Sequence, residues 1–251
     1  MGTETDKSWQ RVTLLNVPVD IVAPDQLSDI VYDFLKEKKE QNIVLLSLWD
    51  LLRARRNNEY RAYVMNASLV IPISKSLISG IKFLTGKTAF RYMPFDFIIS
   101  MLTILEAREF SCYLLGGKRK ILVKTEQNLR QTFPKLRIVG RFPGYFKKHE
   151  ESTIIKAIKK ASPSLLLAGK GIRGEEKWIA KNNTTLGEGI RLWGSDIFDV
   201  FAEKKKRPSR AAFNAGLEWI GYCFQNPFKL FRILPYIRYK FLLLFYKLIV
   251  K

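Results

Sequence analysis

Four carboxylates of this chain fall where alternating strands and helices could use them for proton transfer. Asp96, Glu175, Glu176 and Asp199 are each predicted at a strand-to-helix junction or in the first turns of the helix that follows. A carboxylate placed in a cleft can accept the proton of a reacting hydroxyl group. The same residues at a helix start also cap N–H groups and oppose the helix dipole, with no chemistry implied. Residue type alone leaves both interpretations open.

Glycines follow several of the predicted strands, where a ligand of an α/β sheet would bind. They are Gly116 and Gly117, then Gly144, then Gly169 and Gly171. Backbone N–H groups in such turns can bind phosphate, yet a tight strand-to-helix turn needs glycine with or without a ligand. The sequence contains neither GxGxxG after a first strand nor GxxxxGK[ST]. The glycines therefore predict turns and permit a phosphate site without requiring one.

The chain is strongly basic, with 43 Lys and Arg against 23 Asp and Glu in 251 residues, a formal net charge of +20. Such a field attracts phosphate groups on nucleic acid, on anionic lipid or on a nucleotide-activated substrate. No nucleic-acid recognition motif or arginine-rich arm accompanies the charge, so we expect no nucleic-acid partner. The two cysteines, Cys112 and Cys223, show no zinc or disulfide spacing, which fits a reducing compartment.

Short apolar runs alternate with helix-length amphipathic stretches along most of the chain. We expect strands at 42–48, 68–73, 110–117, 135–142, 163–169 and 189–194, preceded by a hairpin in RVTLLNVPVDIV. Helices are expected at 26–40, 49–58, 74–85, 95–107, 118–132, 149–161, 174–182 and 196–205. Apolar strands separated by helices are typical of buried parallel strands. The pattern predicts an α/β domain over residues 1–205, with a Rossmann-like, doubly wound, mostly parallel sheet.

The last part of the chain, residues 206–251, has no strand signal and is rich in aromatic, aliphatic and basic residues. On a helical wheel Arg238 lies opposite the other basic residues, which are Lys229, Arg232, Lys240, Lys247 and Lys251. We expect a C-terminal helical appendage that binds an anionic membrane surface. The alternative is a helix that packs on the core while its lysines extend to solvent. The longest uncharged run, FLLLFY, is far shorter than the roughly 20 apolar residues of a membrane span.

Five longer motifs occur in a specific order: RVTLLNVPVDIV, YLLGGKRKILVKTEQNLRQTFPKLRIVGRFPGYF, LLLAGKGIRGEEKWI, FDVFAEKKKRPSR and GLEWIGYCFQNPFKLFR. From Val12 to Arg232 this order resembles the WecG/TagA/CpsF glycosyltransferases. The resemblance implies a Rossmann-like core and transfer of a sugar, often N-acetylmannosamine, from a UDP-sugar to a polyprenyl-diphosphate-linked sugar. It also implies a C-terminal appendage that helps to bind the lipid-linked acceptor, and it makes a homo-oligomer reasonable. We expect no cofactor and no metal, since the sequence has no metal-binding carboxylate cluster.

The chain departs from the family pattern at the expected catalytic base. The family carries Pro-Asp-Gly there, with the aspartate as proposed base, whereas this sequence reads Pro72-Ile73-Ser74. Isoleucine cannot accept a proton, so any activity must use another carboxylate, and Asp96 is the candidate catalytic residue. The family's Thr-x-Asn is replaced by Ser47-Leu48-Trp49.

The resemblance and the need to offset charge on a leaving diphosphate give the candidate binding residues. For the donor and its phosphates these are Gly116, Gly117, Gly144, Tyr145, Gly169, Lys170, Gly171, Arg173, Glu175, Glu176 and Asp199. For the acceptor and the membrane they are Arg91, Arg207, Glu218, Lys229, Arg232, Arg238 and Lys240. Glu175 and Glu176 match a Gln-Glu pair that lies in the donor-sugar site of the family.

Three functions remain open, in decreasing order of support. The first is a glycosyltransferase that moves an N-acetylmannosamine-like sugar from a UDP-sugar to a polyprenyl-diphosphate-linked acceptor in cell-envelope polysaccharide biosynthesis. It would act in the cytoplasm, peripherally on the inner face of the cell membrane. The second is a catalytically impaired relative that binds nucleotide sugar or membrane, motivated by Ile73. The third, nucleic-acid binding, rests on charge alone.

Overall fold

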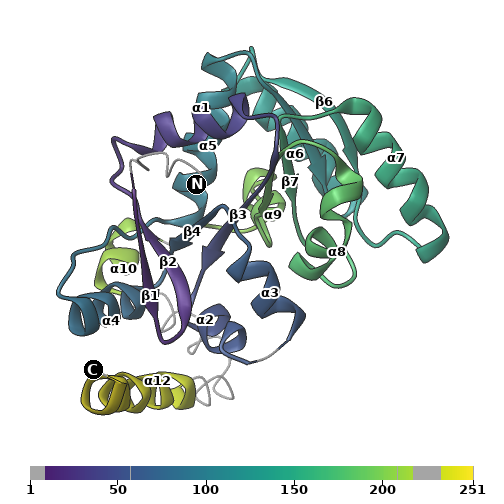
Figure 1. Cartoon of the computed structure of the whole chain (residues 1–251). Helices are drawn as coiled ribbons and strands as arrows, with labels where there is room; N and C mark the ends of the chain where they lie inside the picture. Colours follow the sequence, from purple (N-terminus) through teal and green to yellow (C-terminus); the bar gives the residue numbers. More distant parts are fainter. Residues whose placement is uncertain (1–8, 57, 208, 217–232, 251) are drawn as a thin grey trace.

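A six-stranded, all-parallel sheet forms the centre of the protein, as the computed structural model shows for residues 9–56, 58–207, 209–216 and 233–250 (Figure 1). The strand order is β4-β3-β8-β7-β5-β6. The strands are β3 (Glu40–Leu46), β4 (Leu69–Pro72), β5 (Ser111–Leu115), β6 (Arg137–Phe142), β7 (Leu165–Ala168) and β8 (Gly189–Trp193). The predicted α/β fold with a Rossmann-like parallel sheet is confirmed.

Helices cover both faces of this sheet (Figure 1). One face carries α2 (Leu48–Ala54), α3 (Glu59–Met65), α4 (Lys75–Thr85), α7 (Glu151–Ala161) and α8 (Glu176–Leu186). The other carries α1 (Leu27–Lys36), α5 (Pro94–Ala107), α6 (Arg119–Thr132) and α9 (Ile197–Phe201). Successive residues of a strand point to opposite faces. Leu165 and Leu167 therefore join the second layer's core, while Leu166 and Ala168 join the first.

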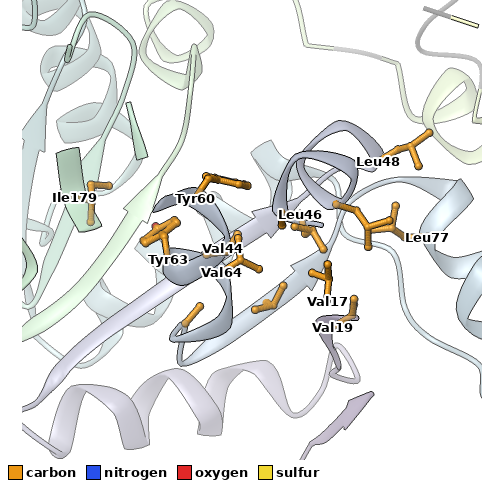
Figure 2. Close-up of a cluster of buried hydrophobic side chains, with 14 of the residues drawn as sticks. Val17, Val19, Val44, Leu46, Leu48, Tyr60, Tyr63, Val64, Leu77 and Ile179 are labelled. Carbon is orange, nitrogen blue, oxygen red and sulfur yellow. The ribbon is translucent and has the colours of Figure 1, made fainter. Parts of the chain in front are cut away.

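The predicted hairpin is present as β1 (Gln10–Leu14) and β2 (Val17–Ile21), which pair antiparallel as a separate two-stranded sheet. Its buried residues Val17 and Val19 belong to the same apolar cluster as Val44 and Leu46 of β3 (Figure 2). Asp20 fixes the hairpin beside β4 because its carboxylate accepts a hydrogen bond from the Val70 amide at 2.6 Å. The hairpin thus extends the first face of the core.

The helix predicted at 49–58 is shorter than expected and is followed by a second helix. Helix α2 ends at Ala54, and α3 begins at Glu59 with Asn58 as its N-cap. The Asn58 side chain accepts a hydrogen bond from the Arg61 amide at 2.9 Å, which satisfies one N–H group of the new helix start. The break turns the chain so that α3 can lie beside α8.

The C-terminal helix α12 (Ile233–Phe245) and the π-helical turn η3 (Tyr246–Val250) pack beside α2 and α4 (Figure 1). The Tyr239 hydroxyl donates to the Ser76 carbonyl at 2.9 Å. Gly80 makes this contact possible, since a Cβ atom there would lie 1.9 Å from the Tyr239 hydroxyl. Within the described ranges, no helix is long and apolar enough to cross a membrane. The predicted acceptor residues Glu218, Lys229 and Arg232 lie outside the described residues.

Candidate active site at the carboxyl edge of the sheet

The carboxyl ends of all six parallel strands lie along one edge of the sheet. From β5 the chain continues to β6 on one side, and from β7 it continues to β8 on the other. Ligands of open α/β sheets bind outside such a switch point. The turns after β5 and β7 contain Gly116, Gly117, Gly169, Lys170 and Gly171, so the structure brings these predicted donor-site residues together.

The backbones of these turns are hydrogen-bonded to one another. The Gly117 amide donates to the Lys170 carbonyl at 2.6 Å, and the Gly144 amide donates to the Gly117 carbonyl at 2.8 Å. A Cβ atom on Gly116 would lie 2.6 Å from the Gly169 carbonyl oxygen, so only glycine fits. These amides already have carbonyl partners. Charge on a ligand here must therefore be met chiefly by side chains.

The N-terminus of α6 supplies such side chains next to the switch point. Its first turn follows Lys118, begins with Arg119 and contains no acidic residue. A cavity of about 630 Å³ beside it is lined by Arg119, Arg141 and the predicted donor residues Gly144 and Tyr145, among others. Basic side chains and a helix N-terminus both favour an anion. Arg119 and Arg141 were not among the sequence candidates, although the run KRK at a helix start was a readable signal.

Lys170 and Asp199, both predicted for the donor site, lie against each other. The Lys170 Nζ atom is 4.0 Å from the Asp199 carboxylate, which Lys204 also approaches at 3.8 Å. The Asp199 side chain is only 19% exposed, while that of Lys170 is 61% exposed. Lys170 is therefore the accessible member of the pair and the one able to reach a phosphate.

Asp96, the predicted catalytic residue, lies in the first turn of α5 and faces two arginines. Its carboxylate oxygens are 4.0 Å from Arg207 and 3.5 Å from Arg210. Arg210 begins the short helix α10 (Arg210–Ala215). These ion pairs link α5 to the segment that leads into α10. They also place Arg207, a predicted acceptor residue, beside Asp96.

Arg91, also predicted for the acceptor, is held at the position where the family base is missing. Its Nε atom donates to the Ile73 carbonyl at 2.9 Å, and its guanidinium lies 3.7 Å from the centre of the Phe213 ring. The Ile73 side chain is partly buried against the core on the face of the sheet that carries α1, α5, α6 and α9. Among the described residues, the end of β4 therefore offers a positive charge and an apolar side chain.

Two partly buried carboxylates, Asp50 and Glu176, lie at this edge on α2 and α8. Ser47 caps α2, and its hydroxyl donates to the Asp50 carboxylate at 2.5 Å. Burial raises the pKa of Asp50. The Glu176 side chain is 14% exposed, and its Oε2 atom lies 3.7 Å from Arg53. Burial, with a contribution from the charge of Asp50, raises the pKa of Glu176 from 4.5 to about 7.

The two adjacent glutamates of the sequence thus occupy different environments. Glu175 is exposed and has a φ of +53°, whereas Glu176 begins α8 and turns its side chain toward α2 and α3. Tyr60 of α3 lies near both carboxylates. Burial is the main cause that raises the pKa of its hydroxyl, and the charges of Asp50 and Glu176 raise it further. A carboxyl group with a pKa near 7 is suited to take a proton at neutral pH.

Sequence reasoning missed Asp50, Arg53 and Tyr60. The spacing Ser47-x-x-Asp50 after a strand is a readable capping signal, and the structure confirms reciprocal capping there. Nothing local indicates that Asp50 and Glu176 would meet, since 126 positions separate them in the chain. The raised pKa values depend on burial between three helices.

Comparisons with known proteins identify the family of this chain. A family model, Glycosyl transferase WecG/TagA/CpsF family, matches residues 12–251. The N-acetylglucosaminyldiphosphoundecaprenol N-acetyl-beta-D-mannosaminyltransferase of Bacillus spizizenii is 22% identical over 221 residues, covering 88% of this chain and 85% of that protein. The protein of the same name from Staphylococcus aureus is 21% identical over 222 residues, covering 88% and 87%. A match over nearly the whole length places this chain in the WecG/TagA/CpsF family of glycosyltransferases.

Proposed function

We propose that this protein transfers an N-acetylmannosamine-like sugar from a UDP-sugar to a polyprenyl-diphosphate-linked sugar in cell-envelope polysaccharide biosynthesis. The two relatives above carry a name that describes this type of acceptor and this type of sugar. The observation that carries the proposal for this chain is the partly buried pair Asp50 and Glu176 at the carboxyl edge. It supplies a proton acceptor where Ile73 cannot.

In the proposed reaction, Glu176 takes the proton of the acceptor hydroxyl. The freed oxygen forms a bond to the anomeric carbon of the donor sugar, and the bond between that carbon and the diphosphate oxygen breaks. UDP leaves with the electron pair of the broken bond. Asp50 is a positioning residue: its charge disfavours ionisation of Glu176, so that the free carboxylate remains a strong enough base near pH 7.

The leaving diphosphate needs positive charge that is already in place when the bond breaks. Lys170 and Arg119 are accessible cations around the turns after β5 and β7, and Arg141, which pairs with Glu126, lies near the end of β6. Arg91 and Arg207 lie farther along the edge, toward β4 and α5, and are suited to the diphosphate of the acceptor. Donor and acceptor would then approach Glu176 from opposite ends of the edge.

We also propose that α12 and η3 bind the inner face of the cell membrane peripherally. Tyr239 and Leu243 face the protein, whereas Phe241, Leu248 and Ile249 are 68%, 79% and 67% exposed. Arg238 and Lys240 are exposed on the same helix. Exposed apolar side chains flanked by basic ones favour the boundary of an anionic bilayer, and this surface would hold the site near a lipid-linked acceptor.

A second candidate is a catalytically impaired relative that still binds nucleotide sugar or membrane. The observation in its favour is Ile73, which replaces the family base. One experiment separates the two candidates. The protein is incubated with a panel of UDP-sugars and a polyprenyl-diphosphate N-acetylglucosamine, and the lipid product is measured by mass spectrometry. Glycosylated lipid with any donor supports transfer, whereas UDP-sugar binding without product supports the second candidate.

A further inference from the structure

A large cavity lies on the first face of the sheet, in the groove between α3 and α8. Its volume is about 990 Å³. Ala62 and Tyr63 of α3 and Trp178 and Ala180 of α8 line it, together with Phe146 from the segment between β6 and α7. It meets the segments that follow the strand ends at Phe146, Lys147, Arg173 and Gly174, and neither Asp50 nor Glu176 lines it. The cavity adjoins the proposed reaction site, because it shares Phe146 with the cavity beside α6 and because burial and the charge of Glu176 both raise the pKa of the Tyr63 hydroxyl.

Two deeply buried polar side chains that line this cavity each have one polar atom without a hydrogen-bond partner among the described residues. Tyr63 is 5% exposed and Asn42 is 7% exposed. In the part of the chain that the structure describes, the Tyr63 hydroxyl and the Asn42 Oδ1 atom have no hydrogen-bond partner. Tyr63 and Val44 of β3 belong to the same apolar cluster (Figure 2), and Asn42 lies two residues before Val44 on the same face of the strand. Buried polar groups in proteins are almost always hydrogen-bonded, so these two need a further molecule.

The orientation of Asn42 is fixed by its neighbours. Its Nδ2 atom donates to Asn183 Oδ1 at 3.1 Å, and Asn183 Nδ2 donates to a Glu40 carboxylate oxygen at 2.8 Å. The Glu40 carboxylate can only accept a hydrogen bond, so the donor and acceptor atoms of both asparagine side chains are fixed. Asn42 therefore presents an acceptor to the cavity, and Tyr63 presents a hydroxyl that can donate.

The rim of the cavity carries an excess of positive charge. Five basic residues line it against two acids, Glu59 and Glu151; the basic residues are Lys147, Lys148, Arg173, Lys177 and Lys181. Glu59 pairs with Lys177 at 3.2 Å, and Glu151 accepts from the Trp178 indole at 2.8 Å. The other four cations pair with no carboxylate within the described residues. A site of this kind favours an anion at its mouth.

We propose that this cavity is a second binding site, for a phosphorylated small molecule whose ring carries hydrogen-bonding groups. The ring would lie against Phe146 and Trp178 and bond to Tyr63 and Asn42, and the phosphate would bind the rim lysines. A nucleotide and a sugar phosphate both have this chemistry. A neutral sugar would leave the rim charge uncompensated, and inorganic phosphate would leave the polar groups of the floor without partners.

Calorimetric titration of the full-length protein tests this site without any turnover. The ligands are UMP, AMP, N-acetylglucosamine 1-phosphate, uridine and inorganic phosphate. We expect at least one nucleotide or the sugar phosphate to bind. Comparison of their affinities shows whether the ring in the cavity belongs to a nucleotide or to a sugar phosphate. Tyr63→Phe should weaken that ligand about tenfold, the scale of one hydrogen bond. Lys181→Gln should also weaken it, whereas Lys160→Gln, the same charge change on α7, should not.

Two controls keep the result specific. Tyr63→Phe removes a hydroxyl without a partner, so its thermal unfolding temperature without ligand should stay at or above that of the parent. Arg119→Gln, in the smaller cavity beside the N-terminus of α6, should leave the affinity unchanged. Equal affinity of the parent and Tyr63→Phe for every ligand would overturn the proposal. So would binding of inorganic phosphate as tight as that of the ring compounds, or no binding at millimolar concentration.

Discussion

Glu176→Gln should stabilise the protein at alkaline pH and have little effect at acid pH. The pKa of Glu176 rises from 4.5 in an exposed setting to about 7 in the fold, chiefly through burial. The ionised form is therefore disfavoured in the folded state. This penalty is absent below pH 4.5, grows as the pH rises from 4.5 to 7, and stays constant above that. At about 1.4 kcal/mol for each unit of pKa, it amounts to about 3 kcal/mol.

Glutamine has the shape of the protonated glutamate and cannot ionise. We expect the free energy of unfolding of Glu176→Gln to exceed that of the parent by about 3 kcal/mol at pH 8, with near equality at pH 4. Urea unfolding followed by circular dichroism at both pH values measures the difference. Glu175→Gln is the matched control because Glu175 is exposed, and its effect should be small at both pH values.

The reasoning about burial fails if the effect of Glu176→Gln is the same at pH 4 and pH 8. It also fails if the glutamine variant is less stable than the parent at pH 8, because that would mean that the ion pair with Arg53 outweighs the burial of the charge.

Two further perturbations test other parts of the account. Asp20→Ala should lower the free energy of unfolding by about 3–5 kcal/mol in urea, because it leaves Arg11 and the Val70 amide without their buried partner; a loss below about 1 kcal/mol would show that the hairpin is held otherwise. The double variant Phe241→Asp with Leu248→Asp should lose sedimentation with phosphatidylglycerol vesicles, whereas Phe90→Asp, at another exposed phenylalanine, should retain it. Unchanged sedimentation of the double variant would exclude α12 as the membrane contact.

The strands and layers were readable from the sequence because their signal is local. Leu165 to Ala168 are all apolar, and such a short run between turns is typical of a parallel strand buried on both faces. The pattern could not show where one helix ends and another begins between Ala54 and Glu59, since both segments have helical composition. The Asn58 cap decides that boundary, and it acts through one side-chain hydrogen bond.

The candidate site was readable in part. The turns at Gly116, Gly117, Gly169 and Gly171 and the cation Lys170 were expected at the carboxyl edge, where the structure places them. The sequence could not indicate that loop carbonyls occupy the amides of these turns. Nor could it distinguish Glu176 from Glu175, because their difference arises from contacts with α2 and α3. Asp96 remains a prediction, now with two arginines beside it.

The most direct test of the central claim is the rate of sugar transfer by Glu176→Gln as a function of pH. We expect kcat to fall by about 10²–10⁴-fold, the usual contribution of a general base. The parent rate should rise with pH through about 7 as Glu176 ionises, and Glu175→Gln and Asp96→Asn should keep a similar profile. A Glu176→Gln enzyme with the parent's rate and pH dependence would contradict the account, as would loss of transfer in Asp96→Asn alone.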